Sequence, residues 1–434
     1  MQSDRSPGYC RLLKNNPDFR NLWYGQVVSE LGDWLNSVAI YTLILQLDGS
    51  GMALAIAMMA KLLPFVVVSP IAGAMIDRMS RKKVMIAADI LRFFAVIALL
   101  LVKDKDDLWL LYALVGMEIA ISAFFEPARS AIIPSITAKS DLVTANSLSG
   151  TTWSAMLAVG AALGGVVAGL LGIEAAFVID ACTFLLSAVF ISRIAVREAE
   201  RKLSAAREPS KNFRDLIEGG KYLLTNPVIL ALSLSKTGLA VAGGIMTLIP
   251  LYANGFFSTP ADIALGIGVM YFARGVGAAI GPLLVKSLFG DSPRVLRTSI
   301  GAGFFLKGAS YMLFAAAPSL LYASLSLGLA TVFGSIIWVF SSSLLHLEAE
   351  DRFLGRVFSW ELATLTLVMG LSNWAAGFAI DHSGLTASAV AFWIGASYVV
   401  PGVSWIAFFL FARDPSRERE IGLAPASSLE KKRA

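Results

Sequence analysis

The sequence predicts an all-α membrane protein with twelve transmembrane helices in two pseudo-symmetric bundles of six. Three observations lead to this fold class: the composition, the apolar segments and the distribution of basic residues. Of the 434 residues, 56% are hydrophobic and 15% are charged, and the mean hydropathy is +0.69. Soluble domains carry about 25% charged residues. The composition therefore excludes an ordinary soluble protein.

Twelve apolar segments have the length of a membrane-spanning helix, which needs about 20 residues. In order, they occupy residues 19–47, 51–76, 84–102, 108–127, 143–171, 174–195, 226–253, 261–288, 297–316, 319–342, 357–381 and 386–412. The connecting loops are short except at 196–225, where charged and polar residues predict a solvated linker with a short surface helix. We therefore expect an N-terminal bundle at 1–195, a cytoplasmic linker at 196–225, and a C-terminal bundle with a cytoplasmic tail at 226–434.

The basic residues predict the orientation, because Lys and Arg gather in cytoplasmic loops. With the N-terminus in the cytoplasm, 29 of the 36 Lys and Arg lie in inner loops and tails or at the inner ends of spans, two lie in an outer loop, and five lie deeper within spans. Both termini are then cytoplasmic, which agrees with an even number of spans. The net charge of +5 reflects this distribution, and we expect no nucleic-acid partner.

The first span carries two carboxylates near its middle, Glu30 and Asp33. On a helix they align with Gln26 and Ser37 at spacings of four, three and four residues, so all four share one face. A charge at the bilayer centre costs about 2.5–3.5 kcal/mol or more. We therefore hypothesise that this stripe faces a central cavity and binds protons or a cation there.

The sequence argues against an enzyme and against a resident metal or cofactor. It contains no G-x-x-x-x-G-K-[ST] segment, so ATP hydrolysis by this chain is not expected. His346 and His382 fall in loops on opposite sides and lack the spacing of zinc ligands. Two cysteines, Cys10 and Cys182, cannot form a disulfide framework. The energy source for any transport is then a gradient.

Each half repeats one plan, in which the second helix leads through a glycine-bearing segment into a short basic loop. The two segments are GAMIDRMSRKK at 73–83 and GPLLVKSLFGDSPR at 281–294. Two parallel halves place a binding site between them at the midplane. The first segment resembles the cytoplasmic signature of the major facilitator superfamily, G-x-L-x-D-R-x-G-R-[KR], with Met75 and Ser80 in place of leucine and glycine. The resemblance covers nearly the whole chain.

Four further segments narrow the resemblance. They are SELGDWL at 29–35, FFEPARSAIIPSI at 124–136, DLVTANSL at 141–148 and LGRVFS at 354–359. They look like segments of bacterial proton-driven exporters, including macrolide-efflux-like and enterobactin-exporter-like proteins. The resemblance implies alternating access and export of a small organic molecule against a proton. It also implies a monomer in the bacterial inner membrane, whose partners are the substrate, protons and the lipid bilayer.

Two features depart from the resembled antiporters. The fourth span has Glu118 where many of them carry an arginine. The fifth span, AVGAALGGVVAG at 158–169, is similar to their glycine-rich motif but lacks its proline. Glycine-rich spans allow close approach of helices, so we expect the fifth and eighth spans to pack at interfaces.

Proton coupling needs a carboxyl whose affinity for protons changes with access to the two sides. Burial favours the neutral carboxyl, and an approaching cation favours the ionised one. Asp33 and Glu30 are the best candidates, and Glu118 at similar depth is a candidate second site for a proton or cation. The alternatives are a fixed ion pair with Lys61 or Arg92 for the first two, and a hydrogen bond to a neighbouring helix for Glu118.

Other residues of the first half have narrower predicted roles. Trp34 and Tyr41 are predicted to line a cavity for planar ligands. Three carboxylates are expected to be structural: Asp89 in an intrahelical pair with Arg92, Glu126 beside Pro127 at the end of its span, and Asp180 packed with a polar partner.

The second half is basic within the membrane. It carries Lys236, Arg274 and Lys307 in mid-span, against Glu361 near the inner surface. Salt bridges between the halves are one interpretation, and they would hold one conformation closed. In the other, Lys236 meets an anionic part of the substrate. An acidic cavity suits lipophilic cations, whereas a cavity with lysine suits catecholate or phosphate-bearing molecules.

The family resemblance implies a gating role for the loop after the second span. Its signature residues are Gly73, Asp77, Arg78 and Arg81. Asp77 would meet the N-terminal end of the eleventh helix, or Arg356 beside it, and so close the inner side. A carboxylate at a helix N-terminus gains about 0.3–1 kcal/mol.

The sequence therefore predicts a secondary active transporter. The favoured function is proton-coupled export, by antiport, of lipophilic small molecules or drugs. Within transport, the alternatives are a siderophore exporter of the enterobactin type and a transporter of lysophospholipid-like amphiphiles. The alternative from another class is a non-transporting membrane receptor or scaffold. Buried mid-span charges argue against a scaffold, because only function justifies their cost.

Overall fold

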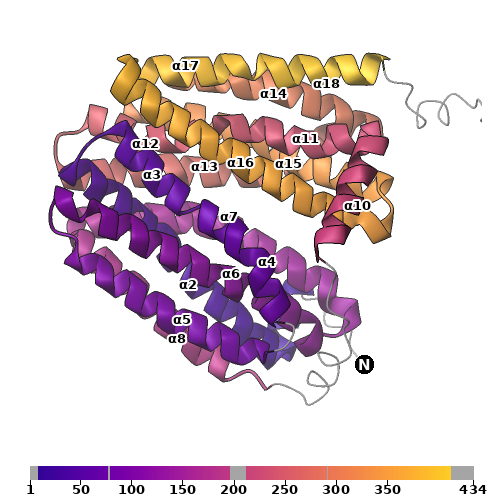
Figure 1. Ribbon diagram of the computed structural model, residues 1–434, viewed down its shortest axis with the longest axis horizontal. Coiled ribbons are helices and arrows are strands. Elements are labelled where there is room, and N and C mark those ends of the chain that lie inside the picture. Colours follow the sequence, from indigo (N-terminus) through magenta and orange to yellow (C-terminus); the bar gives the residue numbers. More distant parts are fainter. Residues whose placement is uncertain (1–7, 77–78, 196–211, 291, 412–434) are drawn as a thin grey trace, which may run out of the picture.

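The computed structural model describes residues 8–76, 79–195, 212–290 and 292–411, and across these ranges it is built of helices without strands (Figure 1). The predicted all-α membrane fold is confirmed. Ten helical segments of the described chain are long and apolar enough to cross a membrane. Two more helices, α2 (Pro17–Leu47) and α14 (Pro293–Ala315), are long but more polar. The structure is therefore consistent with the twelve expected spans.

The helices of the first half follow the expected order. They are α1 (Gly8–Asn15), α2, α3 (Gly51–Ala60), α4 (Leu63–Ile76), α5 (Arg81–Ala98), α6 (Leu108–Ile136), α7 (Leu142–Leu170) and α8 (Ile173–Ser192). The second half contains α10 (Asn212–Thr225), α11 (Pro227–Ala240), α12 (Gly244–Phe256), α13 (Pro260–Phe289), α14, α15 (Leu320–Glu348), α16 (Asp351–Ser383), α17 (Ala387–Ser397) and α18 (Val399–Phe411). Three spans are each built from two consecutive helices: α3 with α4, α11 with α12, and α17 with α18.

Several helices run further than their apolar segments. The largest difference is α6, which continues to Ile136 although the predicted span ends at residue 127. Pro127 and Pro134 lie inside α6, and proline usually ends a helix or kinks it. Residues 128–136 include the buried Ile132 and Ile133, so the end of the predicted span at Pro127 does not mark the end of the helix.

The helix starts follow local capping chemistry. Asn16 accepts a hydrogen bond of 2.9 Å from the backbone N–H of Phe19, and Pro17 occupies the first helical position of α2. Thr259 and Pro260 begin α13 in the same way. Such side chains satisfy N–H groups that have no partner within the helix, and proline has no N–H to satisfy there.

The two bundles lie close together at one end and spread apart toward the end that carries α10 (Figure 1). We call these the far end, where α3 begins, and the α10 end. Along α7 and α13, Gly165 packs on Gly268 and Gly169 packs on Ala261. Along α3 and α16, Gly51 packs on Gly377. These glycine contacts lie toward the far end, so the structure is closed there.

Helix α10 docks onto the start of α16. The ring of Tyr222 stacks on that of Phe353, with centroids 4.2 Å apart. Glu218 pairs with Arg356 at 3.0 Å. The expected surface helix of the linker is therefore present and packed against the second bundle, while 196–211 lies outside the described residues.

Candidate functional site

A cavity of about 350 Å³ lies between the two bundles. The first bundle contributes every charged residue of its wall: Glu30, Asp33, Lys61, Arg92, Glu118 and Glu126. The second bundle contributes neutral side chains, namely Met246, Tyr271, Met369 and Asn373. The wall from the first bundle therefore carries both acidic and basic side chains, whereas the wall from the second bundle is neutral.

Helix α2 supplies the carboxylates that the sequence singled out. Asp33 is partly exposed on the cavity wall, and Glu30 beside it is 8% exposed. Gln26 does not line the cavity. Its amide instead donates hydrogen bonds of 2.9 Å to Glu30 Oε1 and to the carbonyl of Ser149 on α7. Gln26 therefore orients Glu30 and ties α2 to α7.

The two cations of the cavity wall have partners other than Asp33. Arg92 pairs with Asp89, as expected, and its guanidinium lies between two aromatic rings at 4.3 and 4.4 Å. Lys61 donates to the hydroxyl of Ser37. Among the residues that the structure describes, no ion pair within 4.0 Å joins Asp33 to Lys61 or Arg92. Asp33 is thus not held in a fixed pair in this conformation.

Helix α6 presents a second polar stripe to the cavity. Glu118 is 5% exposed and lines the same cavity as Asp33. Ser122 and Glu126 follow at intervals of four residues and also line the cavity. Glu126, which the sequence predicted to be structural, pairs with Arg129 at 2.7 Å and also lines the cavity.

Aromatic side chains join the two halves across the cavity. Trp34 and Tyr41 both line it, and both face Tyr271 on α13, with ring centroids 5.9 and 6.3 Å apart. Trp153 of α7 lies 6.2 Å from Trp34. Sequence reasoning did not identify Trp153 or Tyr271, because each stands alone on its span without a local pattern.

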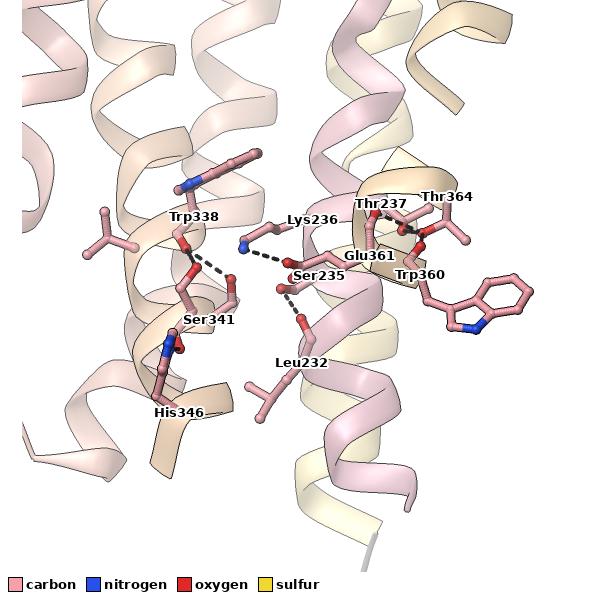
Figure 2. Close-up of polar contacts among 12 residues, drawn as sticks. Leu232, Ser235, Lys236, Thr237, Trp338, Ser341, His346, Trp360, Glu361 and Thr364 are labelled. Atoms are coloured by element: carbon pink, nitrogen blue, oxygen red, sulfur yellow. Dashed lines mark hydrogen bonds and ion pairs between the residues drawn. The ribbon is translucent and has the colours of Figure 1, made fainter. Parts of the chain in front are cut away.

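Lys236 lies away from the cavity, inside the second bundle (Figure 2). Its ammonium donates a hydrogen bond of 2.8 Å to Glu361 Oε2, and both side chains are buried. The ammonium also lies 4.7 Å from the ring centroid of Trp338. For Lys236, the expectation of a salt bridge between the halves is wrong, since α11 and α16 belong to the same half. The carboxylate of Glu361 also occupies the position that the substrate interpretation reserved for an anion.

Lys236→Met is expected to destabilise the protein by about 3–5 kcal/mol, because it leaves the buried Glu361 without its counter-ion. Lys236→Met with Glu361→Leu should recover most of that loss. The measurement is the thermal denaturation midpoint of the purified protein in detergent. Lys307→Met is the control, since Lys307 is also buried but bonds a carbonyl, that of Ala330 at 3.4 Å. If the single and double variants are equally destabilised, the loss comes from packing and not from the unpaired charge.

The predicted gating residues can be followed in part. Gly73 lies on α4, and no described atom lies within 4 Å of the position that a Cβ would take there, whereas Asp77 and Arg78 lie outside the described residues. Arg81 begins α5 and donates a 3.0 Å hydrogen bond to the carbonyl of Ala131 on α6. Arg356 pairs with Glu218, as described above. The described contacts of Arg81 and Arg356 therefore stay outside the seam between the two bundles.

Comparisons with known proteins agree with this architecture. The family profile of the Major Facilitator Superfamily matches residues 22–330. The chain is 28% identical to an uncharacterized MFS-type transporter, YfiS of Bacillus subtilis, over 332 residues, which are 74% of this chain and 70% of YfiS. It is 26% identical to macrolide efflux protein A of Streptococcus pyogenes over 378 residues, covering 85% and 90% of the two chains.

A solved structure gives the same result for the fold. The chain is similar to a POT family transporter in complex with 5-aminolevulinic acid, with a TM-score of 0.69 and 12% sequence identity. The match covers 91% of this chain and 96% of that one. At this identity, the likeness concerns the fold alone.

Proposed function

The chain belongs to the major facilitator superfamily and is a multi-pass membrane transporter, not an enzyme, and from this premise we propose that it exports lipophilic small molecules in exchange for protons. The observation that carries the proposal is the group of carboxylates on the cavity wall. Asp33, Glu30 and Glu118 line the cavity and lie in the interior of predicted spans. A carboxylate within a membrane is costly and by default functional.

In the proposed orientation, the α10 end faces the cytoplasm. The basic loops support this, because cytoplasmic loops carry the excess of Lys and Arg. The structure then corresponds to a conformation closed to the outside, in which the cavity takes up substrate from the cytoplasm or the adjoining membrane. After the bundles rock to the outward-facing state, a proton from outside neutralises Asp33 or Glu30 and releases the substrate. The proton leaves when the cavity faces the cytoplasm again.

The substrate class follows from the cavity wall. Aromatic rings and methionines suit a flat lipophilic body, and the carboxylates attract a positive group, which a ring face also binds. The similarity to macrolide efflux protein A supports export as the direction. Lys236 is engaged by Glu361 and therefore does not support the siderophore and lysophospholipid alternatives. The lysine that does line the cavity, Lys61, donates to the hydroxyl of Ser37. The family assignment also argues against the receptor or scaffold.

The test is extrusion of ethidium and of erythromycin from energised cells that express the protein, compared with cells that carry an empty vector. We expect faster loss of at least one compound, and we expect a protonophore to stop it. Extrusion that continues in the presence of the protonophore would contradict proton coupling. If neither compound leaves faster than from control cells, export of lipophilic drugs is the wrong substrate class.

A further inference from the structure

One cation of the second half lies beside the cavity, in a different setting from the other two. Arg274 follows Tyr271 by one turn of α13, and its guanidinium lies over that ring at 5.0 Å from the centroid. Tyr271 is itself part of the cavity wall. The next residue, Gly275, packs so closely on Ala158 of α7 that a Cβ there would lie 2.7 Å from the Cα of Ala158. Arg274 is therefore at the seam between the halves.

The guanidinium of Arg274 lacks an acceptor for one of its nitrogens. Nη1 is buried, and no hydrogen-bond partner for it occurs in the ranges that the structure describes. The two other mid-span cations of this half both have acceptors, the carboxylate of Glu361 for Lys236 and a carbonyl for Lys307. A buried donor left without an acceptor costs about 1–3 kcal/mol in general, and more when it is charged. Such a group in a folded protein calls for an explanation.

The first-half wall of the cavity, opposite Arg274, carries a buried acceptor without a described donor. Glu30 Oε2 is buried, and no hydrogen-bond partner for it occurs among the described residues. Asp33 and Glu118 add two more carboxylates on the same side of the cavity. Between the two walls lie the rings of Trp34 and Tyr271. The first half therefore presents carboxylates to the cavity together with two cations, Lys61 and Arg92, which have described partners in Ser37 and Asp89. On the second half, Arg274 lies beside the cavity with a buried donor that has no described acceptor, and the flat rings lie between the two sides.

We propose that Arg274 binds an anionic oxygen group of the transported molecule, which makes an aromatic zwitterion the preferred substrate class. The amine of such a molecule lies against the carboxylates of the first half. Its flat body packs on the aromatic rings, and its carboxylate or phosphate reaches Arg274. A guanidinium is suited to this role, because its planar fork of N–H groups matches both anions. The assignment rests on the proposed function only in placing the substrate in this cavity.

The test compares ciprofloxacin, a flat ring system with an amine and a carboxylate, with its methyl ester, which lacks the negative charge. Binding of both to the purified protein in phosphatidylcholine nanodiscs is measured by isothermal titration calorimetry. We expect the wild type to bind the acid about ten to a hundred times more tightly than the ester, the range that a charge-assisted hydrogen bond gives. In Arg274→Gln this ratio should fall to about one, with little change for the ester.

Lys307→Gln is the matched control. It removes a buried cation of the same half that packs on Tyr311, and Tyr311, unlike Tyr271, is not part of the cavity wall, so this variant should keep the wild-type ratio. The proposal is overturned if the wild type does not prefer the acid, or if Arg274→Gln weakens both ligands equally, which indicates a structural role. It is also overturned if phosphatidylglycerol in the nanodiscs removes the preference, because Arg274 then holds a lipid headgroup.

These measurements need no gradient. Loss of proton coupling would contradict the proposed function without changing the affinity ratio. If the wild type shows no preference for the acid over the ester, the role assigned to Arg274 is wrong, whereas the proposal of proton-coupled export is unaffected.

Discussion

Asp33→Asn is expected to reduce proton-driven extrusion to the level of cells without the protein. Asparagine has nearly the shape of aspartate, but it neither ionises nor carries an exchangeable acidic proton. The substitution therefore keeps the packing of α2 and removes both the charge that attracts a cationic substrate and the group that exchanges the proton. We expect this effect at Asp33 because, among the described residues, no ion pair engages its carboxylate.

The measurement is ethidium efflux from energised cells, with the amount of protein in the membrane checked by immunoblot. Asp18→Asn is the control, since it makes the same change on the same helix, at a residue that accepts a 2.8 Å hydrogen bond from the backbone of Ala195 outside the cavity. Asp18→Asn should extrude ethidium like the wild type. Wild-type efflux in Asp33→Asn that still stops with a protonophore would move the coupling role to Glu30 or Glu118.

The sequence predicted the parts of this structure that depend on local patterns. Hydropathy located the spans, since each must present about 20 apolar residues to the bilayer. The stripe on α2 was visible because helical periodicity alone places Glu30 and Asp33 on one face. Glu126 shows the limit of such patterns. With Pro127 taken as the end of the span, Glu126 is predicted to lie at a helix end, yet α6 continues to Ile136 and keeps Glu126 in line with Glu118.

Contacts between segments that are far apart in the sequence could not be predicted from these local patterns. Lys236 and Glu361 are 125 residues apart, and no spacing within either helix shows that α11 and α16 are neighbours. Tyr271 belongs to the cavity only because α13 packs on α7 through glycines of both helices. The sequence predicted that the glycine-rich spans pack closely, but not which side chains this packing brings to the cavity.

Gly377→Leu is expected to abolish export by preventing closure of the far end. A Cβ at Gly377 would lie 2.7 Å from the carbonyl oxygen of Gly51 and 2.8 Å from the Cβ of Ala55, so a larger side chain pushes α16 away from α3. The same displacement breaks a cap between the halves. Asp381 of α16 accepts hydrogen bonds of 3.0 and 2.7 Å from the first two N–H groups of α3, on Gly51 and Met52. Such groups at a helix start have no partner within their own helix.

The substitution should therefore trap the transporter open to the outside. The check is thiol labelling in a variant whose two cysteines, Cys10 and Cys182, are replaced by alanine, with Met246→Cys as a reporter in the cavity. A membrane-impermeant maleimide added to intact cells should label the reporter faster in Gly377→Leu. Gly255→Leu is the control, because no atom of the described residues lies within 4 Å of the position that a Cβ would take there. Since alternating access requires each end to close in turn, faster labelling together with lost ethidium efflux would identify this contact as the outer closure. Unchanged labelling with normal efflux would show that the contact between α3 and α16 is not needed for it.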